Sequence, residues 1–371
     1  MPAEAAAQPA ANYAAPLRVA VVGAGVFGRN HLRVYRELQQ AGLPIQLAAV
    51  IDPDERARAQ AEADYGVRAF PTIEACMAAR MAPARAELRI DAASLCVPTI
   101  QHADCAELLL RSGIDLLIEK PLAAGLAEAD QIVRLAREHA RIVQAGHLER
   151  FNPAVRAVRA LLNRPMFFEV HRLSVFTPRS LDVDVVLDLM IHDLDIVMDL
   201  VASPVRELRA VGLPVLSAKV DIANVRLEFE NGCVANFTAS RVSTERVRKM
   251  RFFQPHQYLS LDFARQDLLL IDVTAAAGLS PSELTALIER HSKPEAPGEP
   301  QHPTAGLSMS KIPVAPGEPL RLELESFLNA VRTRTPPVVD ANAGRRALAL
   351  ALEINTAIAA HAHRAGLKDR E

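Results

Sequence analysis

Short apolar runs alternate with longer amphipathic stretches over the first part of the chain. The runs LRVAVVG from Leu17 and IQLAAVID from Ile45 flank residues 26–40, where apolar positions recur with helical spacing. The alternation continues through ASLCVP at 93–98, a helical stretch from about Gln101, DLLIEKP at 115–121, a helical stretch at 127–139 and RIVQAG at 141–146. This order is typical of a parallel sheet covered by helices. We therefore predict an α/β domain with a parallel sheet over residues 17–146.

Beyond residue 146, successive strand-like runs replace this alternation. Residues 206–273 hold several runs in which apolar and polar positions alternate, and Asn231-Gly232 between two of them is typical of a hairpin turn. We predict a C-terminal α+β domain over residues 147–365, with a largely antiparallel open sheet that serves substrate binding and oligomerisation. Its other expected elements are a helix after Pro153, a strand from Met166, and helices at about 186–201, 320–333 and 343–360.

Two segments fall outside these patterns. Residues 1–16 are rich in alanine and hold no lysine or arginine, so they lack the positive start of a signal peptide, and we expect a disordered tail. Residues 292–319 contain seven prolines and three glycines, which predicts a loop.

Composition narrows the class of protein. The formal net charge of −2 gives no general attraction to nucleic acid or to anionic membranes, and no apolar run reaches the length of a membrane helix. The four cysteines form no CxxC pair, which suits a reducing cytoplasm. We expect a soluble cytoplasmic protein that binds neither nucleic acid nor membrane.

The sequence Gly23-Ala24-Gly25-Val26-Phe27-Gly28 follows a predicted strand and opens a predicted helix. Its glycines permit a tight turn, close approach of a pyrophosphate and close helix packing, while the helix N-terminus offers N–H groups to the anion. Asp52 ends the next strand, 24 residues after Gly28. A carboxylate there can accept hydrogen bonds from the ribose hydroxyls of a dinucleotide and repels the 2′-phosphate of NADP. The pattern indicates a Rossmann dinucleotide-binding domain over residues 17–146, with NAD as the cofactor. Capping of the following helix is the alternative role for Asp52.

Further polar residues follow the next two predicted strands. Ligands of open α/β sheets bind at the carboxyl ends of the strands, so these residues are expected to line the cofactor crevice. They are Pro98, Thr99 and His102 after ASLCV, and Glu119 and Lys120 after DLLI.

Asp188 and His192 lie four residues apart on a predicted helix, which places both side chains on one face. Oxidation of a secondary alcohol needs a group that takes the hydroxyl proton, and Lys120 and His192 are the candidates. Taken singly, Lys120 is more typical of a solvated surface, and His192 of a helix histidine bonded to Asp188 or Asp195. Their joint occurrence after a dinucleotide fold is what points to catalysis. The histidines show no close ligand cluster, so we expect no metal.

The set GAGVFG, CVPTIQHA, EKPLA and DLMIHDLD, in this order and spacing, resembles the glucose-fructose oxidoreductase, inositol dehydrogenase and MocA family (Gfo/Idh/MocA) over residues 17–360. The motif EKP followed about 70 residues later by DxxxHxxD is its most specific part. The resemblance implies that Lys120 is the catalytic lysine and that Asp188 and His192 complete the site. It also implies a homodimer or homotetramer joined through the open sheet.

This chain departs from the commonest family pattern. Val185, Val186 and Met190 stand where many members carry glycines. Together with GHLERFNPAV at 146–155, this resembles the branch that oxidises C3 of nucleotide-linked N-acetylated amino sugars. The expected substrate is UDP-N-acetylglucosamine, oxidised to its 3-keto sugar. Substrate contacts are expected from Lys120, Asp188, His192, Arg150, Asn152, Arg172 and Arg179, although each arginine is also compatible with an ordinary solvated strand or loop.

Two alternatives stay open. Another polyol or sugar, such as an inositol, an aldose or a different nucleotide sugar, fits the same motifs. A non-catalytic NAD(H)-binding regulator would keep the fold and sense redox state, and Lys120, Asp188 and His192 argue against it.

Overall fold

The computed structural model describes residues 15–81, 89–177, 183–273, 279–283, 285–286 and 308–366, which form two compact units. The first unit comprises Met1–Gly146 and Leu324–Ala341, and the second comprises His147–Glu323 and Asn342–Glu371. The chain thus returns to its first unit near the C-terminal end, which a single boundary at residue 146 does not anticipate. Residues 1–14 of the expected tail and residues 292–307 of the expected loop lie outside the described residues.

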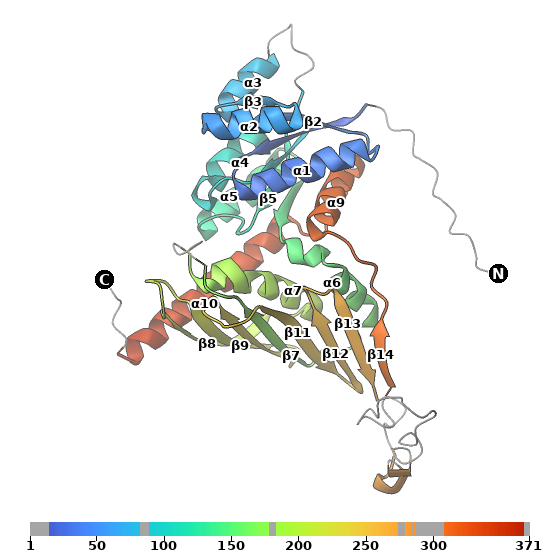
Figure 1. The fold of residues 1–371 in the computed structure, drawn as a ribbon. Coiled ribbons are helices and arrows are strands. Elements are labelled where there is room, and N and C mark those ends of the chain that lie inside the picture. The colour runs from blue at the N-terminus through green and yellow to red at the C-terminus, as the bar shows by residue number, and fades with distance from the viewer. Residues whose placement is uncertain are drawn as a thin grey trace, which may run out of the picture. The chain divides into compact units, whose positions relative to one another are not determined.

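A six-stranded parallel sheet forms the centre of the first unit (Figure 1). The strand order β3-β2-β1-β4-β5-β6 places β1 and β4 side by side, where the direction of chain connection reverses. Strands β1, β4, β5 and β6 are mostly apolar and buried, as a sheet covered on both faces requires, whereas the edge strand β3 has no buried residue. The strands are β1 Leu17–Val22, β2 Ile45–Ile51, β3 Arg68–Phe70, β4 Ala92–Leu95, β5 Asp115–Glu119 and β6 Val143–Gly146.

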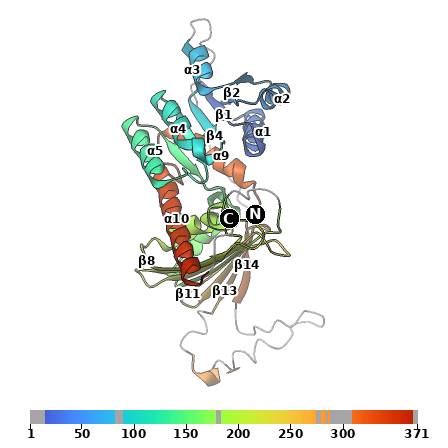
Figure 2. The same ribbon diagram turned by 90° about the vertical axis from the view of Figure 1, so that its left-hand side faces the viewer.

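Helices cover both faces of this sheet. Figure 2 shows α4 and α5 on one side, and α1 and α2 on the other. Helix α1 buries Leu32, Tyr35 and Leu38, which recur with helical spacing. The helices are α1 Val26–Gln40, α2 Glu55–Tyr65, α3 Ile73–Met81, α4 His102–Arg111, preceded by a 3₁₀ turn at Thr99–Gln101, and α5 Leu126–Glu138.

The segment Leu324–Ala341 completes the first unit. It carries most of α9 (Pro319–Thr333), whose Leu324, Phe327 and Leu328 are buried. The backbone after α9 then reaches the edge strand β6, where the Ala145 N–H donates to the Val339 carbonyl oxygen over 2.9 Å. An exposed strand edge is thereby partly covered.

The second unit is built on an eight-stranded sheet of order β14-β13-β12-β11-β7-β10-β9-β8. The β7–β10 pair is parallel and the other pairs are antiparallel, so the predicted largely antiparallel sheet and the predicted fold class are confirmed. Asn231 and Gly232 lie in the β9–β10 hairpin turn, where Gly232 has a φ of +85°. The strands are β7 Phe167–Leu173, β8 Val205–Leu213, β9 Ile222–Phe229, β10 Val234–Ser240, β11 Val247–Gln254, β12 Gln257–Asp262, β13 Asp267–Asp272 and β14 Ser308–Ile312. The prediction of a loop over 292–319 is wrong at Ser308–Ile312, which form β14.

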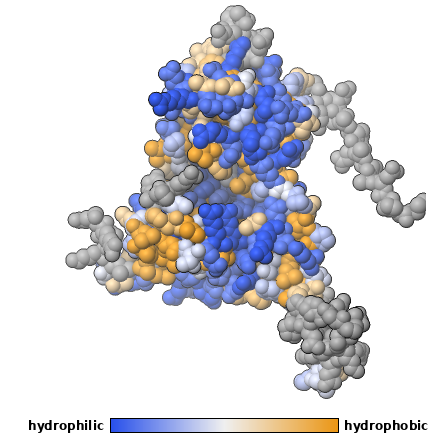
Figure 3. Space-filling view, viewed as in Figure 1, coloured by the Kyte–Doolittle hydropathy of each residue, from blue (hydrophilic) through white to orange (hydrophobic). Residues whose placement is uncertain are grey.

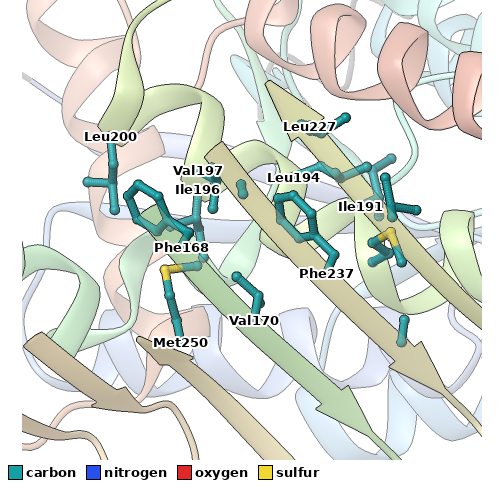
Figure 4. Packing of buried hydrophobic residues seen from close by; sticks show 14 of the residues in the cluster. Phe168, Val170, Ile191, Leu194, Ile196, Val197, Leu200, Leu227, Phe237 and Met250 are labelled. Carbon is teal, nitrogen blue, oxygen red and sulfur yellow. The ribbon is translucent and has the colours of Figure 1, made fainter. Parts of the chain in front are cut away.

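Helices of the second unit pack on one face of this sheet (Figure 1). Figure 4 shows Ile191, Leu194 and Val197 of α7 against Phe168 and Phe237 of the sheet. Alternate strand residues point toward this core, as in β7, where Phe168, Val170 and Arg172 are buried. The helices are α6 Pro153–Val158, α7 Ile191–Val201, preceded by a π-helical turn at Val186–Met190, and α10 Ala341–Arg364, with 3₁₀ turns at Leu148–Phe151 and Arg159–Leu161.

Hydrophilic and apolar residues are interspersed on the face that Figure 3 shows, with an apolar area near β8 and α10 of the second unit. Leu213, Val215 and Leu216 at the end of β8 and beyond are among the exposed apolar residues. Within the described ranges, no helix is both long and apolar enough to cross a membrane.

Candidate active site

The glycine-rich turn between β1 and α1 has the geometry of a dinucleotide-binding loop. Gly23 has a φ of +91°, and a Cβ there would lie 2.7 Å from backbone of the loop after β4, so this turn requires glycine. A Cβ at Gly28 would lie 1.8 Å from the Gly23 carbonyl oxygen. By contrast, nothing lies within 4 Å of a Cβ built on Gly25, and Val26 and Phe27 beside it are exposed. A pyrophosphate can therefore approach the first N–H groups of α1.

Two backbone N–H groups fix the carboxylate of Asp52, which follows β2. The Ala24 N–H donates to Oδ2 over 2.6 Å, and the Asp54 N–H donates to Oδ1 over 2.8 Å. Each oxygen retains a lone pair for a ligand hydroxyl. The capping role belongs to Asp54 instead, since its side chain accepts the Arg56 N–H at the start of α2.

His102 connects two loops at the carboxyl ends of the strands. Its Nδ1 lies 3.0 Å from the Pro121 carbonyl oxygen and its Nε2 lies 3.0 Å from that of Val97. Burial lowers the pKa of the His102 imidazole, although the two carbonyl groups act in the opposite direction. Pro98 and Thr99 lie in the loop that this ring holds, Pro98 exposed and Thr99 half-buried. The geometry thus gives His102 a bridging position between the β4 and β5 loops.

Glu119 ends β5 and Lys120 follows it. Oε1 of Glu119 lies 3.0 Å from Nε2 of His31, a buried residue in the second turn of α1. Gly146 at the end of β6 leaves space for this carboxylate, because a Cβ there would lie 3.1 Å from Oε1. Lys120 is half-buried. Since β1, β4 and β5 are neighbours in the parallel sheet, the glycine turn, Thr99 and Lys120 share one edge.

Asp188 and His192 lie on either side of a change in helix type. Asp188 belongs to the π-helical turn, and His192 lies in the first turn of α7, so their spacing is not that of a regular α-helix. Asp184 caps the π-helical turn, with Oδ1 accepting the Val186 N–H over 2.9 Å. The His192 ring meets the ring of His147 edge-on, with 6.4 Å between centroids and an interplanar angle of 84°.

Arg150 and Asn152 have partners within the second unit. Nε of Arg150 lies 2.6 Å from Oδ2 of Asp195, and its Nη1 lies 2.5 Å from Oδ2 of Asp199. Burial opposes the charge of Arg150, but these two carboxylates outweigh it and raise the pKa of the guanidinium. Oδ1 of Asn152 accepts the Ala154 N–H and so caps α6. Asp195, the alternative partner considered for His192, is thus bonded to Arg150.

Arg172 is likewise buried among carboxylates. Its Nε and Nη2 lie 2.7 and 2.8 Å from the two oxygens of Asp193, and its Nη1 lies 3.0 Å from Oε1 of Glu149. Burial opposes the charge, yet these carboxylates raise the pKa of the Arg172 guanidinium above its ordinary value. The guanidinium also lies 5.3 Å from the ring centroid of Phe263. Arg179 lies outside the described residues. Direct substrate contact by any of these side chains stays a prediction.

The sequence interpretation missed two histidines, His31 and His147. His31 lies three residues after the last glycine of the turn, on the buried face of α1, where a histidine is easily taken as part of the core. His147 directly follows β6, at the same carboxyl edge of the sheet as Thr99 and Lys120. That position after a strand was the available signal for it.

The residues around the glycine turn fit a dinucleotide: open space at Gly25, an accessible helix N-terminus and an oriented carboxylate at Asp52. Two family models agree with this geometry. Residues 17–147 match the oxidoreductase family model with an NAD-binding Rossmann fold, and residues 141–254 match the Gfo/Idh/MocA C-terminal domain.

Individual relatives extend this likeness along the chain. A UDP-N-acetylglucosamine 3-dehydrogenase from Acidithiobacillus ferrooxidans is 34% identical over 349 residues, which are 94% of this chain and 99% of that protein. The solved structure of a UDP-N-acetylglucosamine 3-dehydrogenase from the same organism matches with a TM-score of 0.77 at 33% identity, over 93% of this chain and 98% of its own. An inositol 2-dehydrogenase from Corynebacterium glutamicum is 30% identical over 198 residues, 51% of this chain and 55% of its own. The chain is therefore an NAD-binding oxidoreductase that belongs to the Gfo/Idh/MocA family.

Proposed function

We propose that the protein oxidises the C3 hydroxyl of UDP-N-acetylglucosamine to a ketone, with NAD⁺ as the oxidant. One observation carries the proposal: the relation to a UDP-N-acetylglucosamine 3-dehydrogenase spans nearly the whole length of both chains, second unit included. The inositol dehydrogenase, by comparison, matches over about half of each chain. We expect the second unit to supply most substrate contacts. A relative that matches this unit as well as the first is therefore a better guide to the substrate than one that matches over half of the chain.

When bound, NAD⁺ accepts the hydride that leaves the carbon bearing the hydroxyl. The chain must then remove the hydroxyl proton and stabilise negative charge on the oxygen. Lys120, at the carboxyl edge of the cofactor sheet, can donate a charge-assisted hydrogen bond to that oxygen. Either Lys120 or His192 takes the proton, and Asp188 orients His192 or a sugar hydroxyl.

The three arginines expected near the substrate have different roles in this proposal. Arg150 and Arg172 already have carboxylate partners in Asp195 and Asp193, so little net charge is left for a diphosphate. We propose that both arginines hold the segment after β6 in place, and that Arg179 supplies positive charge to the nucleotide. Replacement of Arg179 by methionine is then expected to raise KM for the sugar nucleotide more than replacement of Arg150 does.

Formation of NADH from NAD⁺ and UDP-N-acetylglucosamine tests the proposal. Its near-ultraviolet absorbance reports turnover, and an aminotransferase with an amino donor removes the ketone to draw the equilibrium forward. We expect turnover in the natural protein and, in Lys120→Met, a loss of about a hundredfold or more with NADH binding retained. Lys219→Met is the matched control, because Lys219 is exposed in the segment between β8 and β9.

Each other outcome has a definite meaning. Turnover with an inositol but not with the sugar nucleotide would transfer the proposal to the second candidate, which the inositol dehydrogenase relative favours. Full activity of Lys120→Met would remove Lys120 from the mechanism. Tight NADH binding without turnover on a broad sugar panel would support a regulator instead of an enzyme.

The cysteines bear on the compartment in which the protein works. We propose a cytoplasmic homodimer or homotetramer. All four cysteines lie in the described ranges and none forms a disulfide, as a reducing compartment would favour.

A further inference from the structure

Three side chains of different chemistry meet beneath the glycine turn. They are His31 on α1, Cys96 just after β4 and Glu119 at the end of β5. One nitrogen, one sulfur and one carboxylate oxygen from them all lie within 4.8 Å of one another. It is the one such group of histidine, cysteine and acidic side chains among the residues that the structure describes.

Gly146 makes space for the carboxylate of this cluster. A Cβ on Gly146 would lie 3.1 Å from Oε1 of Glu119, whereas a Cβ on Gly28 would be in ordinary van der Waals contact with Cys96, 3.5 Å from its Cβ. The sheet order places β4 and β5 side by side, with α1 leading out of the neighbouring strand β1. The three donors are therefore brought together by the ends of two neighbouring strands and the helix after β1.

We propose that His31, Cys96 and Glu119 form a binding site for a soft divalent cation of the Zn²⁺ class. Atoms no further apart than 4.8 Å have a common point within about 2.8 Å of each, and shifts of less than about an ångström give the roughly 2.0–2.3 Å of zinc bonds. Thiolate and carboxylate together neutralise a dication, so no net charge is buried. Imidazole with thiolate selects zinc over magnesium or calcium.

The site is suited to reversible binding. Nδ1 of His31 is buried and has no hydrogen-bond partner, whereas strongly bound zinc histidines donate their second nitrogen to an acceptor. The cation also displaces the hydrogen bond between His31 and Glu119. We therefore expect an affinity in the micromolar range, well below that of structural zinc sites.

Binding of the cation opposes binding of the dinucleotide. The Cys96 carbonyl oxygen lies only 2.7 Å from the position of a Cβ on Gly23, so the Cys96 backbone packs directly against the turn. Movement of Cys96 toward a cation shifts this turn, which would hold the pyrophosphate. The expected consequence is that Zn²⁺ weakens NADH binding by about tenfold, and that NADH weakens Zn²⁺ binding by the same factor.

Cobalt titration of the full-length protein under reducing, oxygen-free conditions tests the site. Co²⁺ bound to a thiolate gives a near-ultraviolet charge-transfer band, and Zn²⁺ should displace it. We expect this band in the natural protein and in Cys105→Ser, the matched control on α4, and its loss in Cys96→Ser. An unchanged band in Cys96→Ser, or no band in the natural protein, would overturn the proposal.

A second measurement needs no variant. Iodoacetamide labels accessible thiols, and mass spectrometry reads each cysteine separately. Zn²⁺ should protect Cys96 at least tenfold and leave Cys105 unprotected, whereas equal labelling of Cys96 with and without Zn²⁺ would contradict the site. Both experiments use no sugar substrate, so their failure is distinct from failure of the proposed function.

Discussion

Gly25 and Gly28 belong to one motif, yet the absence of a side chain has a different consequence at each. At Gly28 a methyl group would collide with the Gly23 carbonyl oxygen, whereas at Gly25 it would enter open space. Gly25 also has a φ of −64°, which any residue adopts easily. Stability and cofactor binding are therefore separable within the turn.

We predict opposite effects for the two alanine variants. Gly28→Ala should lower the free energy of unfolding by about 3 kcal/mol or more, because the backbone must move. Gly25→Ala should stay within about 1 kcal/mol of the natural protein but bind NADH at least about tenfold more weakly, since its methyl group occupies the path of the pyrophosphate. Denaturant unfolding and NADH fluorescence measure the two effects. Normal NADH affinity in Gly25→Ala would contradict the assignment of the turn.

His102 gives the first unit a dependence on pH. Its pKa in the folded protein lies below the ordinary value of about 6.5, mainly because it is buried. Above about pH 6.5 the ring is neutral in both the folded and the unfolded chain. Below this pH the unfolded chain binds a proton that the folded chain does not, so stability falls as the pH falls.

Comparison with His102→Gln isolates this contribution. We expect the free energy of unfolding to fall less between pH 7 and pH 5 in the variant than in the natural protein, whatever the stability of the variant at pH 7. Thermal unfolding at several pH values measures the two slopes. Equal slopes would mean that His102 does not titrate differently in the folded chain.

The sequence predicted individual residues well where backbone sterics or a motif decides their role. The glycine turn and the position of Asp52 are of this kind. Internal pairing of Arg150 and Arg172 could not be predicted, because the carboxylates that pair with them lie 21 or more residues away in the sequence. Charge alone does not distinguish a guanidinium that awaits a diphosphate from one that already has a partner.

At the scale of elements, α7 and β7 are joined by a buried ion pair. Arg172 on β7 and Asp193 on α7 have side chains that are 5% and 3% exposed. A buried pair adds little net stability, but removal of one partner leaves an uncompensated charge in the core. The position of the helix that carries His192 therefore depends on a pair of charges in addition to apolar packing.

We predict that Asp193→Asn lowers the free energy of unfolding by about 3–5 kcal/mol. Glu207→Gln is the matched control, because Glu207 pairs with Arg209 at the surface, and it should cost less than about 1 kcal/mol. Combining Asp193→Leu with Arg172→Met should recover part of the loss, since the unpaired guanidinium is then removed and Glu149 keeps Arg248, whose Nη1 lies 4.0 Å from its Oε1. A raised KM for the sugar nucleotide in Arg172→Met at normal stability would instead favour direct substrate contact.

The sequence predicted most elements, but two features have no local signal. The π-helical turn at Val186–Met190 lies in a stretch for which the sequence predicts one continuous helix from about 186 to 201. Strand β14 lies in a segment rich in proline and glycine, and it is a strand because β13 offers it an open edge. For β14, pairing with β13 overrides the local preference.

At the scale of the whole molecule, the helices of the second unit leave the other sheet face open in the described structure (Figures 1 and 2). Phe167, Phe253 and Tyr258 form a continuous aromatic row on that face, with ring centroids 5.7 and 5.0 Å apart. Phe253 is 38% exposed. Such a row favours burial against a second copy of the chain.

We therefore predict a dimer or tetramer that depends on this row. Phe253→Arg should lower the mass measured by light scattering, because a cation would then face the apolar surface of the partner. Leu216→Arg, a similar change at an exposed apolar residue outside the row, should leave the mass unchanged. A monomeric natural protein would exclude this role for the open face.

The return of residues 324–341 to the first unit has a consequence for biosynthesis. When the ribosome has released residue 146, α9 and the covering of β6 are still missing, and they emerge only after most of the second unit has been made. At about 5–20 residues per second this delay is on the order of ten seconds or more. Chains truncated before α9 should therefore have an incompletely folded dinucleotide-binding unit, which remains a substrate for chaperones and proteases. NAD is thus expected to bind, and by binding to stabilise, only chains that are long enough to contain α9.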